Sequence, residues 1–378
     1  MKFDHIELYH VSMPLIEPWR TAYGQDLAIE SVVVRSICGD RQAWSETAPF
    51  AAPCYSPEWA AGTFDVLKRW LAPAVVGMEI EDAADLARRL NVFKGNPFAR
   101  AALDEAWHIH AAMEAGLPLH RHLGATRDRV DVGADFGVAD TIDALLASID
   151  EAVKKGFKRV KLKFRPGWDL DMVAAVRRTF PDLTMHVDCN SAFTLDALDL
   201  FRKLDEYDLA MIEQPLAHDD LIDHAELARS VGTPICLDES IVSIERARHA
   251  IRLKSCSWIN IKPGRVGGLT SAVEIHDFCR DAGVGCWVGG MLESAIGAAI
   301  CIALAMLDNF IYPADIFPTS RFYAEDLADP PTLLDLSTGG PQCVAPPTAG
   351  LAPRPVPERL EACTLQRAVV TRGAKSSY

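Results

Sequence analysis

The spacing of apolar and polar residues changes character at about residue 125. Before that point, three short segments carry the apolar runs and alternations of an antiparallel meander; they are 6–15, 31–39 and 43–50. A polar and aromatic stretch, 17–26, separates the first two and predicts a loop that carries Trp19. Helical spacing follows, and Gly116 stands where a helix is expected to end. Residues 1–125 therefore predict an α+β domain.

From about residue 126, strand-like and helix-like segments alternate. The candidate strands are 130–138, 159–164, 183–190, 209–215, 233–240, 257–264 and 284–290. Seven or eight such units in one chain predict an α/β fold of the (β/α) barrel, or TIM barrel, type. We expect the barrel to occupy 126–323, and the Pro-rich segment 324–378 to return to the first domain.

Composition narrows the possible partners. The formal net charge is −14, which disfavours a nucleic acid or an anionic membrane surface as the partner. No apolar run is long enough to span a bilayer, and the first residues carry no apolar signal core. The ten cysteines are scattered without a C-x-x-C pair, as expected for reduced thiols in a cytoplasmic protein.

Five ionisable residues recur at the predicted strand ends with the period of the β/α unit. They are Lys163, Asp188, Glu213, Asp238 and Lys262, each 24 or 25 residues after the one before. The carboxyl ends of barrel strands share one face, where active sites are built. We therefore expect these side chains to meet around one cavity.

The chemistry of this set is specific. Three carboxylates cannot stay ionised together without a cation, and an all-oxygen set favours Mg²⁺, or alternatively Mn²⁺. A cation beside a substrate carboxylate stabilises the enediolate that forms when the α-proton leaves. Lysine acts as the base only where burial and like charge disfavour its ammonium form, and Lys161 stands two residues from Lys163 on the same strand face.

In order along the chain, KLKF, DCNSAF, IEQPL, LDES, NIKPGRVGG and GGMLESAIG resemble the enolase superfamily, muconate-lactonizing subgroup. They are most similar to its o-succinylbenzoate synthase / N-succinylamino acid racemase group. The resemblance implies a modified (β/α)₇β barrel with an α+β capping domain, a small-molecule carboxylate substrate and a homo-oligomer. It also implies that Lys163 and Lys262 are acid/base catalysts on opposite substrate faces, that Lys161 adds positive charge, and that Mg²⁺ binds to Asp188, Glu213 and Asp238.

The same resemblance implies roles for further residues. Asn190 and Glu239 adjoin the ligands and are expected to tune them. The turn with Gly290, Met291 and Ser294 is expected to line an acyl pocket. Loops around Trp19 and Tyr55 are expected to close over the substrate as a lid, and Arg265 either binds an anionic group or is solvated.

The sequence departs from the family pattern in three places. The turn GGMLES lacks the Arg that often follows its second glycine, Phe193 stands where Tyr is common, and the third departure is Asp135. Asp135 stands on the first barrel strand, where this group usually carries a small hydroxyl residue. A carboxylate facing the substrate would repel an acidic group and favour a cation or a hydrogen-bond donor. The substitution bears on the choice of substrate and leaves the lysines and carboxylates intact.

These residues also allow structural explanations and several different functions. Lys161 and Lys163 could be a salt-bridged pair, and the acidic residues could be helix N-caps, although Glu213 fits a cap poorly. The same catalytic set serves an N-acylamino acid racemase, an o-succinylbenzoate synthase, a muconate-type cycloisomerase and a dipeptide or cyclic amino acid epimerase. Different classes are a Schiff-base aldolase using Lys163 and a non-catalytic barrel.

Overall fold

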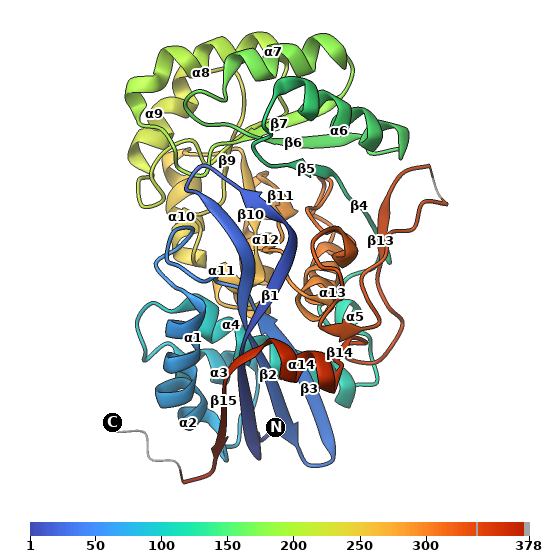
Figure 1. Cartoon of the computed structure of the whole chain (residues 1–378). Coiled ribbons are helices and arrows are strands. Elements are labelled where there is room, and N and C mark those ends of the chain that lie inside the picture. The colour runs from blue at the N-terminus through green and yellow to red at the C-terminus, as the bar shows by residue number, and fades with distance from the viewer. Residues whose placement is uncertain (338, 374–378) are drawn as a thin grey trace.

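An antiparallel sheet and a curled parallel sheet organise the computed structural model, which describes residues 1–337 and 339–373 (Figure 1). The antiparallel sheet has the order β15-β1-β2-β3. Its strands are β1 His5–Arg20, β2 Gln25–Cys38, β3 Arg41–Thr47 and β15 Thr364–Thr371. The predicted α+β domain is confirmed, and β15 shows that the C-terminal segment completes its sheet.

Alternation along β1 and β2 sends side chains to two different layers. Ile6, Leu8, Val32 and Val34 pack against the helices of the capping domain. The intervening residues face a second apolar cluster, which also contains barrel residues such as Met291. The sheet is therefore buried on both faces, which explains its continuous apolar run at 32–34.

The helices of the capping domain come after β3 in the chain. They are α1 Ala60–Val66, the π-helical turn η1 Leu67–Leu71, α2 Ala72–Val75, α3 Ala83–Leu90, α4 Pro97–Glu114 and α5 Leu119–His122. Gly116 lies just beyond α4 with φ +67°, as expected of a residue that ends a helix.

The parallel sheet has the order β11-β10-β9-β8-β7-β6-β5. Its strands are β5 Ala134–Phe136, β6 Arg159–Lys163, β7 Thr184–Asp188, β8 Ile212–Glu213, β9 Ile235–Leu237, β10 Trp258–Ile261 and β11 Gly285–Val288. The segment 310–316 closes the barrel as an eighth strand, through single bridges from Phe310 to Cys286 and from Ala314 to Val132. The predicted (β/α)₇β barrel is therefore confirmed.

Helices surround the barrel strands, and the outer ones are shown in green and yellow in Figure 1. They are α6 Ile142–Lys154, α7 Leu170–Thr179, α8 Leu198–Leu204, α9 Ile222–Ser230, α10 Ile244–Leu253, α11 Pro263–Val266, α12 Leu269–Ala282 and α13 Ala295–Ala305, with the turns η2 Leu195–Ala197, η3 Asp205–Tyr207 and η4 Thr319–Arg321. The remaining elements are β4 Arg129–Asp131, β12 Ala328–Asp329, β13 Gln342–Val344, β14 Arg354–Pro355 and α14 Pro357–Cys363.

Two sequence expectations need correction. The segment 17–26 is mostly strand, because β1 runs to Arg20 and pairs with β2 up to Arg20↔Gln25, which leaves only a short turn at 21–24. The ladder of a long hairpin satisfies backbone groups that the polar composition suggested would face water in a loop. The segment 130–138 is divided, since β4 pairs with β13 and only β5 joins the barrel.

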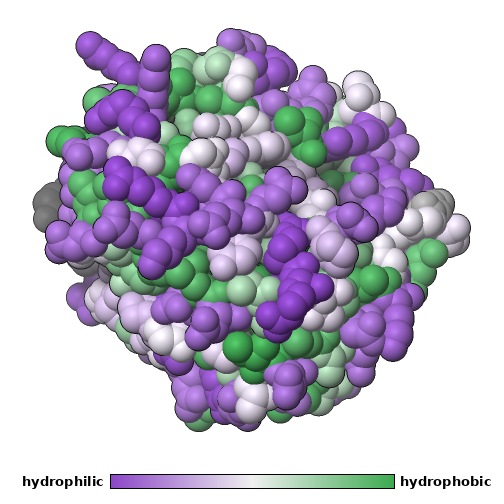
Figure 2. Space-filling view, turned by 90° about the horizontal axis from the view of Figure 1, so that it is seen from above, coloured by the Kyte–Doolittle hydropathy of each residue, from purple (hydrophilic) through white to green (hydrophobic). Residues whose placement is uncertain are grey.

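The surface fits the acidic, mixed composition. Seen from above, the face that includes α6, α7 and α8 carries mostly hydrophilic side chains with small apolar patches between them (Figure 2). Among the described residues, no helix combines the length and the apolar character needed to cross a bilayer.

Candidate active site

Three cationic side chains point into the barrel from β6. Arg159, Lys161 and Lys163 alternate with apolar residues, and all three are buried. The neighbouring strands are in register, so Lys163 pairs with Asp188 and Asp188 pairs with Glu213. The predicted residues of consecutive strand ends are therefore direct neighbours.

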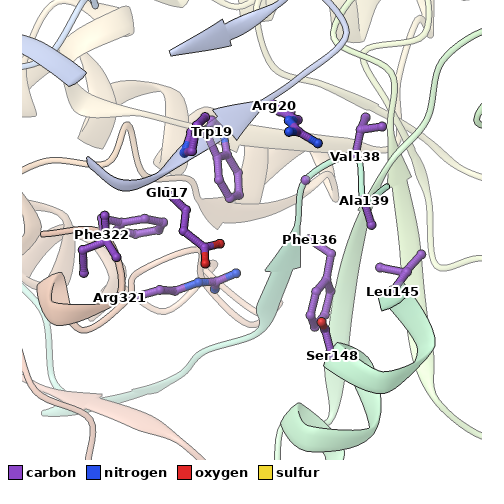
Figure 3. Close-up of a pocket in the computed structure, with 13 residues that line it drawn as sticks. Glu17, Trp19, Arg20, Phe136, Val138, Ala139, Leu145, Ser148, Arg321 and Phe322 are labelled. Carbon is purple, nitrogen blue, oxygen red and sulfur yellow. The ribbon is translucent and has the colours of Figure 1, made fainter. Parts of the chain in front are cut away.

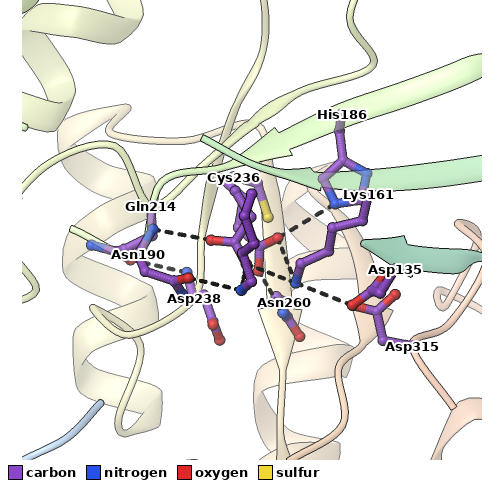
Figure 4. Close-up of polar contacts among 12 residues, drawn as sticks. Asp135, Lys161, His186, Asn190, Gln214, Cys236, Asp238, Asn260 and Asp315 are labelled. Carbon is purple, nitrogen blue, oxygen red and sulfur yellow. Dashed lines mark hydrogen bonds and ion pairs between the residues drawn. The ribbon is translucent and has the colours of Figure 1, made fainter. Parts of the chain in front are cut away.

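Lys161 lies at the centre of the acidic cluster. Its Nζ is 3.0 Å from Oδ2 of Asp188, 3.0 Å from Oε2 of Glu213 and 3.1 Å from Oδ2 of Asp315 (Figure 4). It also lies 5.1 Å from the ring centre of Trp287. Burial lowers the pKa of Lys161, but the surrounding carboxylates outweigh burial and hold it well above its ordinary value.

Lys163 is held at the mouth of the barrel. Its Nζ donates to Oδ2 of Asp188 at 2.8 Å and to Oδ1 of Asn190 at 2.7 Å. Asn190 in turn donates to Oε1 of Glu239 at 3.0 Å. Burial, together with the charge of Asp188, raises the pKa of Glu239 to about 7. Asn190 and Glu239 therefore connect the end of β7 with the end of β9.

Lys262 occupies the other side of the carboxylates. Its Nζ is 3.0 Å from Oδ2 of Asp238 and 4.5 Å from the ring centre of Tyr55. Tyr55 donates to Asp238 at 3.2 Å and accepts from Nη1 of Arg265 at 2.8 Å. Burial lowers the pKa of Lys262, but the charges of Tyr55, Glu213 and Glu239 raise it above its ordinary value, opposite to the lowered pKa expected of a base. A cation held by the carboxylates would offset their charge and lower this pKa.

The location of Arg265 tests one of its two predicted roles. Only 1% of the side chain is exposed, and its guanidinium contacts Asp238 and donates to the carbonyls of Ile241 and Asn260. The solvated alternative is therefore wrong. Arg265 therefore holds the hydroxyl of Tyr55 and the carboxylate of Asp238 in place.

The donor set fits a hard divalent cation in its chemistry. Asp188, Glu213 and Asp238 are buried oxygen donors on adjacent strand ends, and one ammonium already lies 3.0 Å from both of the first two. Oε2 of Glu239 is buried without a hydrogen bond, whereas Oε2 of Glu213 pairs with the ammonium of Lys161. In the described part of the chain, no three His, Cys, Asp or Glu side chains already form a metal-binding group. Lysine ammonium groups lie 2.8–3.0 Å from the three carboxylates.

Asp135 forms an ion pair with Arg159, a residue that the sequence analysis did not identify. Nη1 of Arg159 lies 3.1 Å from Oδ1 of Asp135, and Nη2 of Arg159 lies 2.6 Å from Oδ1 of Asp315. A Cβ at Gly133 would overlap the guanidinium of Arg159, so only glycine leaves room for that group. Burial raises the pKa of Asp135 to about 7, and the charge of Asp315 adds to the effect. Asp135 is therefore part of a buried ion cluster rather than an isolated carboxylate in the pocket.

Other residues at the site were also missed. Nδ2 of Asn260 donates to Oε1 of Glu213 at 2.8 Å, and Nε2 of His186 lies 3.4 Å from Oε2 of the same residue. His186 and Asn260 share the inward face of their strands with Asp188 and Lys262 by period two, so the alternation could have indicated both. Asp315 lies in the bridge-only eighth strand and carries no comparable signal.

The predicted pocket residues lie on two sides of the barrel mouth. Trp19 lines a cavity of about 450 Å³ together with Phe136, Arg321 and Phe322, and its ring meets that of Phe322 edge to face (Figure 3). Gly290 and Met291 come after β11, and a Cβ at Gly290 would lie 2.6 Å from the carbonyl oxygen of Asp315.

The hydroxyl of Ser294 makes a hydrogen bond within the protein. It precedes α13 as its N-cap residue, and its Oγ donates to Oε2 of Glu46 at 2.5 Å. Ser294 is fully buried. Its hydroxyl is therefore engaged with the capping domain.

Comparisons with known proteins agree with this geometry. The family model described as enolase C-terminal domain-like matches residues 144–343. The chain is 41% identical over 332 residues to o-succinylbenzoate synthase of Geobacillus kaustophilus, covering 87% of this chain and 88% of that protein. It is 40% identical over 370 residues to N-succinylamino acid racemase of Amycolatopsis sp, covering 96% and 98%.

A solved structure extends the likeness to the whole fold. An enolase superfamily member from Listeria innocua superposes with a TM-score of 0.93 at 33% identity, covering 98% of this chain and 99% of that one. The match includes the capping domain as well as the barrel. The predicted resemblance is confirmed, and this chain is an enzyme of the enolase superfamily.

Proposed function

We propose that this enzyme removes the proton α to a carboxylate and forms an enediolate, acting as an N-acylamino acid racemase, an o-succinylbenzoate synthase or both. One observation carries the proposal. Lys163 ends β6 and Lys262 comes directly after β10, with three strands between them that carry the buried carboxylates. Two ammonium groups on either side of one acidic centre suit a substrate whose α-carbon is approached from two faces.

The lysines have distinct tasks in each direction of the reaction. One lysine, as the free amine, takes the α-proton, and the other, as the ammonium, delivers a proton to the opposite face. Asn190 orients Lys163 through its 2.7 Å bond, while Tyr55 orients Lys262 through its ring. Lys161 supplies fixed positive charge beside the carboxylates.

We propose Asp188, Glu213 and Asp238 as ligands of Mg²⁺, with Mn²⁺ as an alternative. When bound, the cation supplies positive charge beside the substrate carboxylate and so stabilises the dianionic enediolate. The carboxylates fit this task because they are buried and all-oxygen.

The product depends on the step after proton removal. Return of a proton from the second lysine gives the epimer of an N-acylamino acid. Loss of a β-hydroxyl as water gives a dehydrated acid, which is the outcome we expect for an o-succinylbenzoate synthase. The identity of about 40% to proteins with both names supports testing both substrates first.

The test is a screen of N-succinylated and N-acetylated amino acids for α-deuterium incorporation from D₂O with Mg²⁺, alongside the synthase reaction. The proposal predicts incorporation at the α-carbon and its abolition by EDTA, with recovery on adding Mg²⁺. Activity that survives complete metal removal would contradict it. Trapping of Lys163 by borohydride with a carbonyl substrate would support the aldolase alternative, and wild-type activity in Lys163→Met and Lys262→Met would support a barrel whose lysines are not catalytic.

A further inference from the structure

Glu46 is a buried carboxylate of the capping domain that contacts the barrel. It lies on β3, only 3% exposed, and its bonding is unrelated to the lysine centre. Oε1 accepts from the backbone N–H of Ser294 at 3.2 Å, and Oε2 accepts from Oγ of Ser294 at 2.5 Å and from the N–H of Gly297 at 3.1 Å. One side chain thus satisfies three donors at the start of α13.

The barrel segment that Glu46 holds is the turn between β11 and α13. This turn contains Gly290 and Met291, the residues expected at the acyl pocket. Its backbone is strained, since Leu292 has φ +59° without being glycine. Tyr323 donates to the carbonyl of Leu292 from the C-terminal side. A strained turn keeps one conformation only where its surroundings determine it.

The second segment is the lid that comes after β3. Glu46 is nine residues before Tyr55, and the chain between them contains Ala48 and Phe50. Both pack in the same apolar cluster as Met291. Oγ of Ser31 donates to Oε1 of Glu46 at 3.0 Å, which fixes the carboxylate from β2. Glu46 therefore lies just before the lid segment 48–58 in the chain and contacts the end of the turn 289–294.

Gly297 allows the start of α13 to approach the carboxylate of Glu46 closely. A Cβ at Gly297 would lie 3.2 Å from Oε2 of Glu46 and 2.6 Å from Cβ of Glu293. A side chain at Gly297 would therefore push the helix start away from β3. The glycine permits the close approach that the carboxylate then stabilises.

We propose that Glu46 is a positioning residue that holds the turn 289–294 and the lid 48–58 in one relative geometry and thereby sets which acyl group the pocket accepts. The acyl-selection part rests on the proposed function. Glu46 touches neither the lysines nor the carboxylates of the centre, so it acts through the two segments. Loosening them changes the fit of the acyl group more than the proton transfer.

The test compares Glu46→Gln with a matched control. Glutamine keeps the volume but removes an acceptor. Asp205→Asn is the control, because Asp205 accepts from the N–H groups of Gly232 and Thr233 and from Oγ1 of Thr233, at 2.7–2.8 Å, away from the active site. Ser294→Ala is the second variant, which removes one donor and keeps the backbone, should Glu46→Gln fold poorly.

Two readouts decide the result. In Glu46→Gln, amide hydrogen exchange is expected to rise about tenfold in peptides covering 289–297 and 48–58, whereas Asp205→Asn changes only its own surroundings. The ratio of kcat/KM for the N-succinyl and N-acetyl forms of one amino acid is expected to shift about tenfold through KM, with kcat of the better substrate within about threefold.

The outcomes separate the positioning role from the proposed function. Unchanged exchange in both segments of a folded Glu46→Gln protein overturns the proposal. So does looser exchange with an unchanged substrate ratio, because Glu46 would then have only a structural role. If the wild type turns over no acylated amino acid, the proposed function fails and acyl selection fails with it, while the exchange data still decide whether Glu46 anchors both segments.

Discussion

Lys163 and Asp188 end neighbouring strands in register, and Nζ of Lys163 lies 2.8 Å from Oδ2 of Asp188. Lys262 follows β10, and its Nζ lies 3.0 Å from Oδ2 of Asp238, which follows β9. Glu213 lies between the two pairs in strand order. The site therefore has an approximate symmetry, with one lysine and one carboxylate on each side of a central glutamate. Such an arrangement suits the proposed reaction, in which a proton is removed from one face of an α-carbon and returned to the other.

Replacing either outer lysine should abolish net racemisation. In Lys163→Met and Lys262→Met, the expected loss in kcat is about 10²–10⁴-fold, the range for a positioned acid or base. Each variant should still exchange the α-proton of one enantiomer through the remaining lysine, as followed by NMR in D₂O. The exposed Lys158, one residue before β6, provides the control Lys158→Ala, which should retain wild-type rates. Normal racemisation in both methionine variants would falsify the two-base assignment.

Tyr55→Phe should weaken the binding of Mg²⁺ at the proposed site without removing the ring beside Lys262. The hydroxyl donates to Asp238 and accepts from Arg265, so its loss leaves buried partners unsatisfied. We expect about tenfold more Mg²⁺ for half-maximal exchange activity, which corresponds to a hydrogen bond of about 1–1.5 kcal/mol. Tyr207→Phe, on η3, is the control for losing a tyrosine hydroxyl. An unaltered Mg²⁺ titration would show that Tyr55 does not support the ligand.

The main site residues could be predicted because the β/α unit has a regular length. Residues in phase with that unit, from Lys163 to Lys262, reach the same face of the barrel whatever the intervening helices contain. The inward position of Arg159 could also have been predicted, since it shares the period-two face of Lys161 and Lys163. It was overlooked because a basic residue at the start of a strand usually lies at the surface.

Other features depend on tertiary contacts that spacing does not encode. Asp315 lies in a segment that joins the barrel by single bridges, so no repeat marks it. The extension of β1 to Arg20 depends on hairpin pairing with β2 across a register shift, against a polar sequence with prolines. The partner of Asp135 is Arg159, and only the folded barrel shows that this carboxylate is already paired.

Asp135→Ser should destabilise the barrel, although serine is the kind of residue that this family usually carries there. Arg159 would keep Asp315 and the carbonyl of Pro313 as partners, so the cost is expected to be about 1–3 kcal/mol rather than that of a fully unpaired buried charge. Urea unfolding at neutral pH measures it. In the cycle with Arg159→Met, the double variant should lose less stability than the sum of the single losses. Strictly additive losses would mean that the two side chains do not interact.

The last prediction concerns the pH dependence of stability through Glu58. This carboxylate accepts from the N–H groups of Phe98 and Ala99 at the start of α4, at 3.0 and 3.3 Å. Burial raises its pKa from 4.5 to about 7, although the two N–H groups act in the opposite direction. A folded-state pKa above the unfolded value means that the folded protein binds the proton more tightly. The stabilising contribution is therefore complete below about pH 4.5 and is lost as the pH rises to about 7.

Glu58→Gln removes this titration while keeping the shape of the side chain. The stability of the wild type relative to this variant should fall by about 3 kcal/mol between pH 4.5 and 8, because the pKa of Glu58 is about 7 in the folded protein and 4.5 in the unfolded chain. Urea unfolding of both proteins across this range measures the difference. Because other buried acids titrate in both proteins, their contribution cancels in this difference. The exposed Glu226→Gln variant controls for the loss of one surface carboxyl. Parallel stability curves for wild type and Glu58→Gln would show that the carboxyl titrates alike in the folded and unfolded chains.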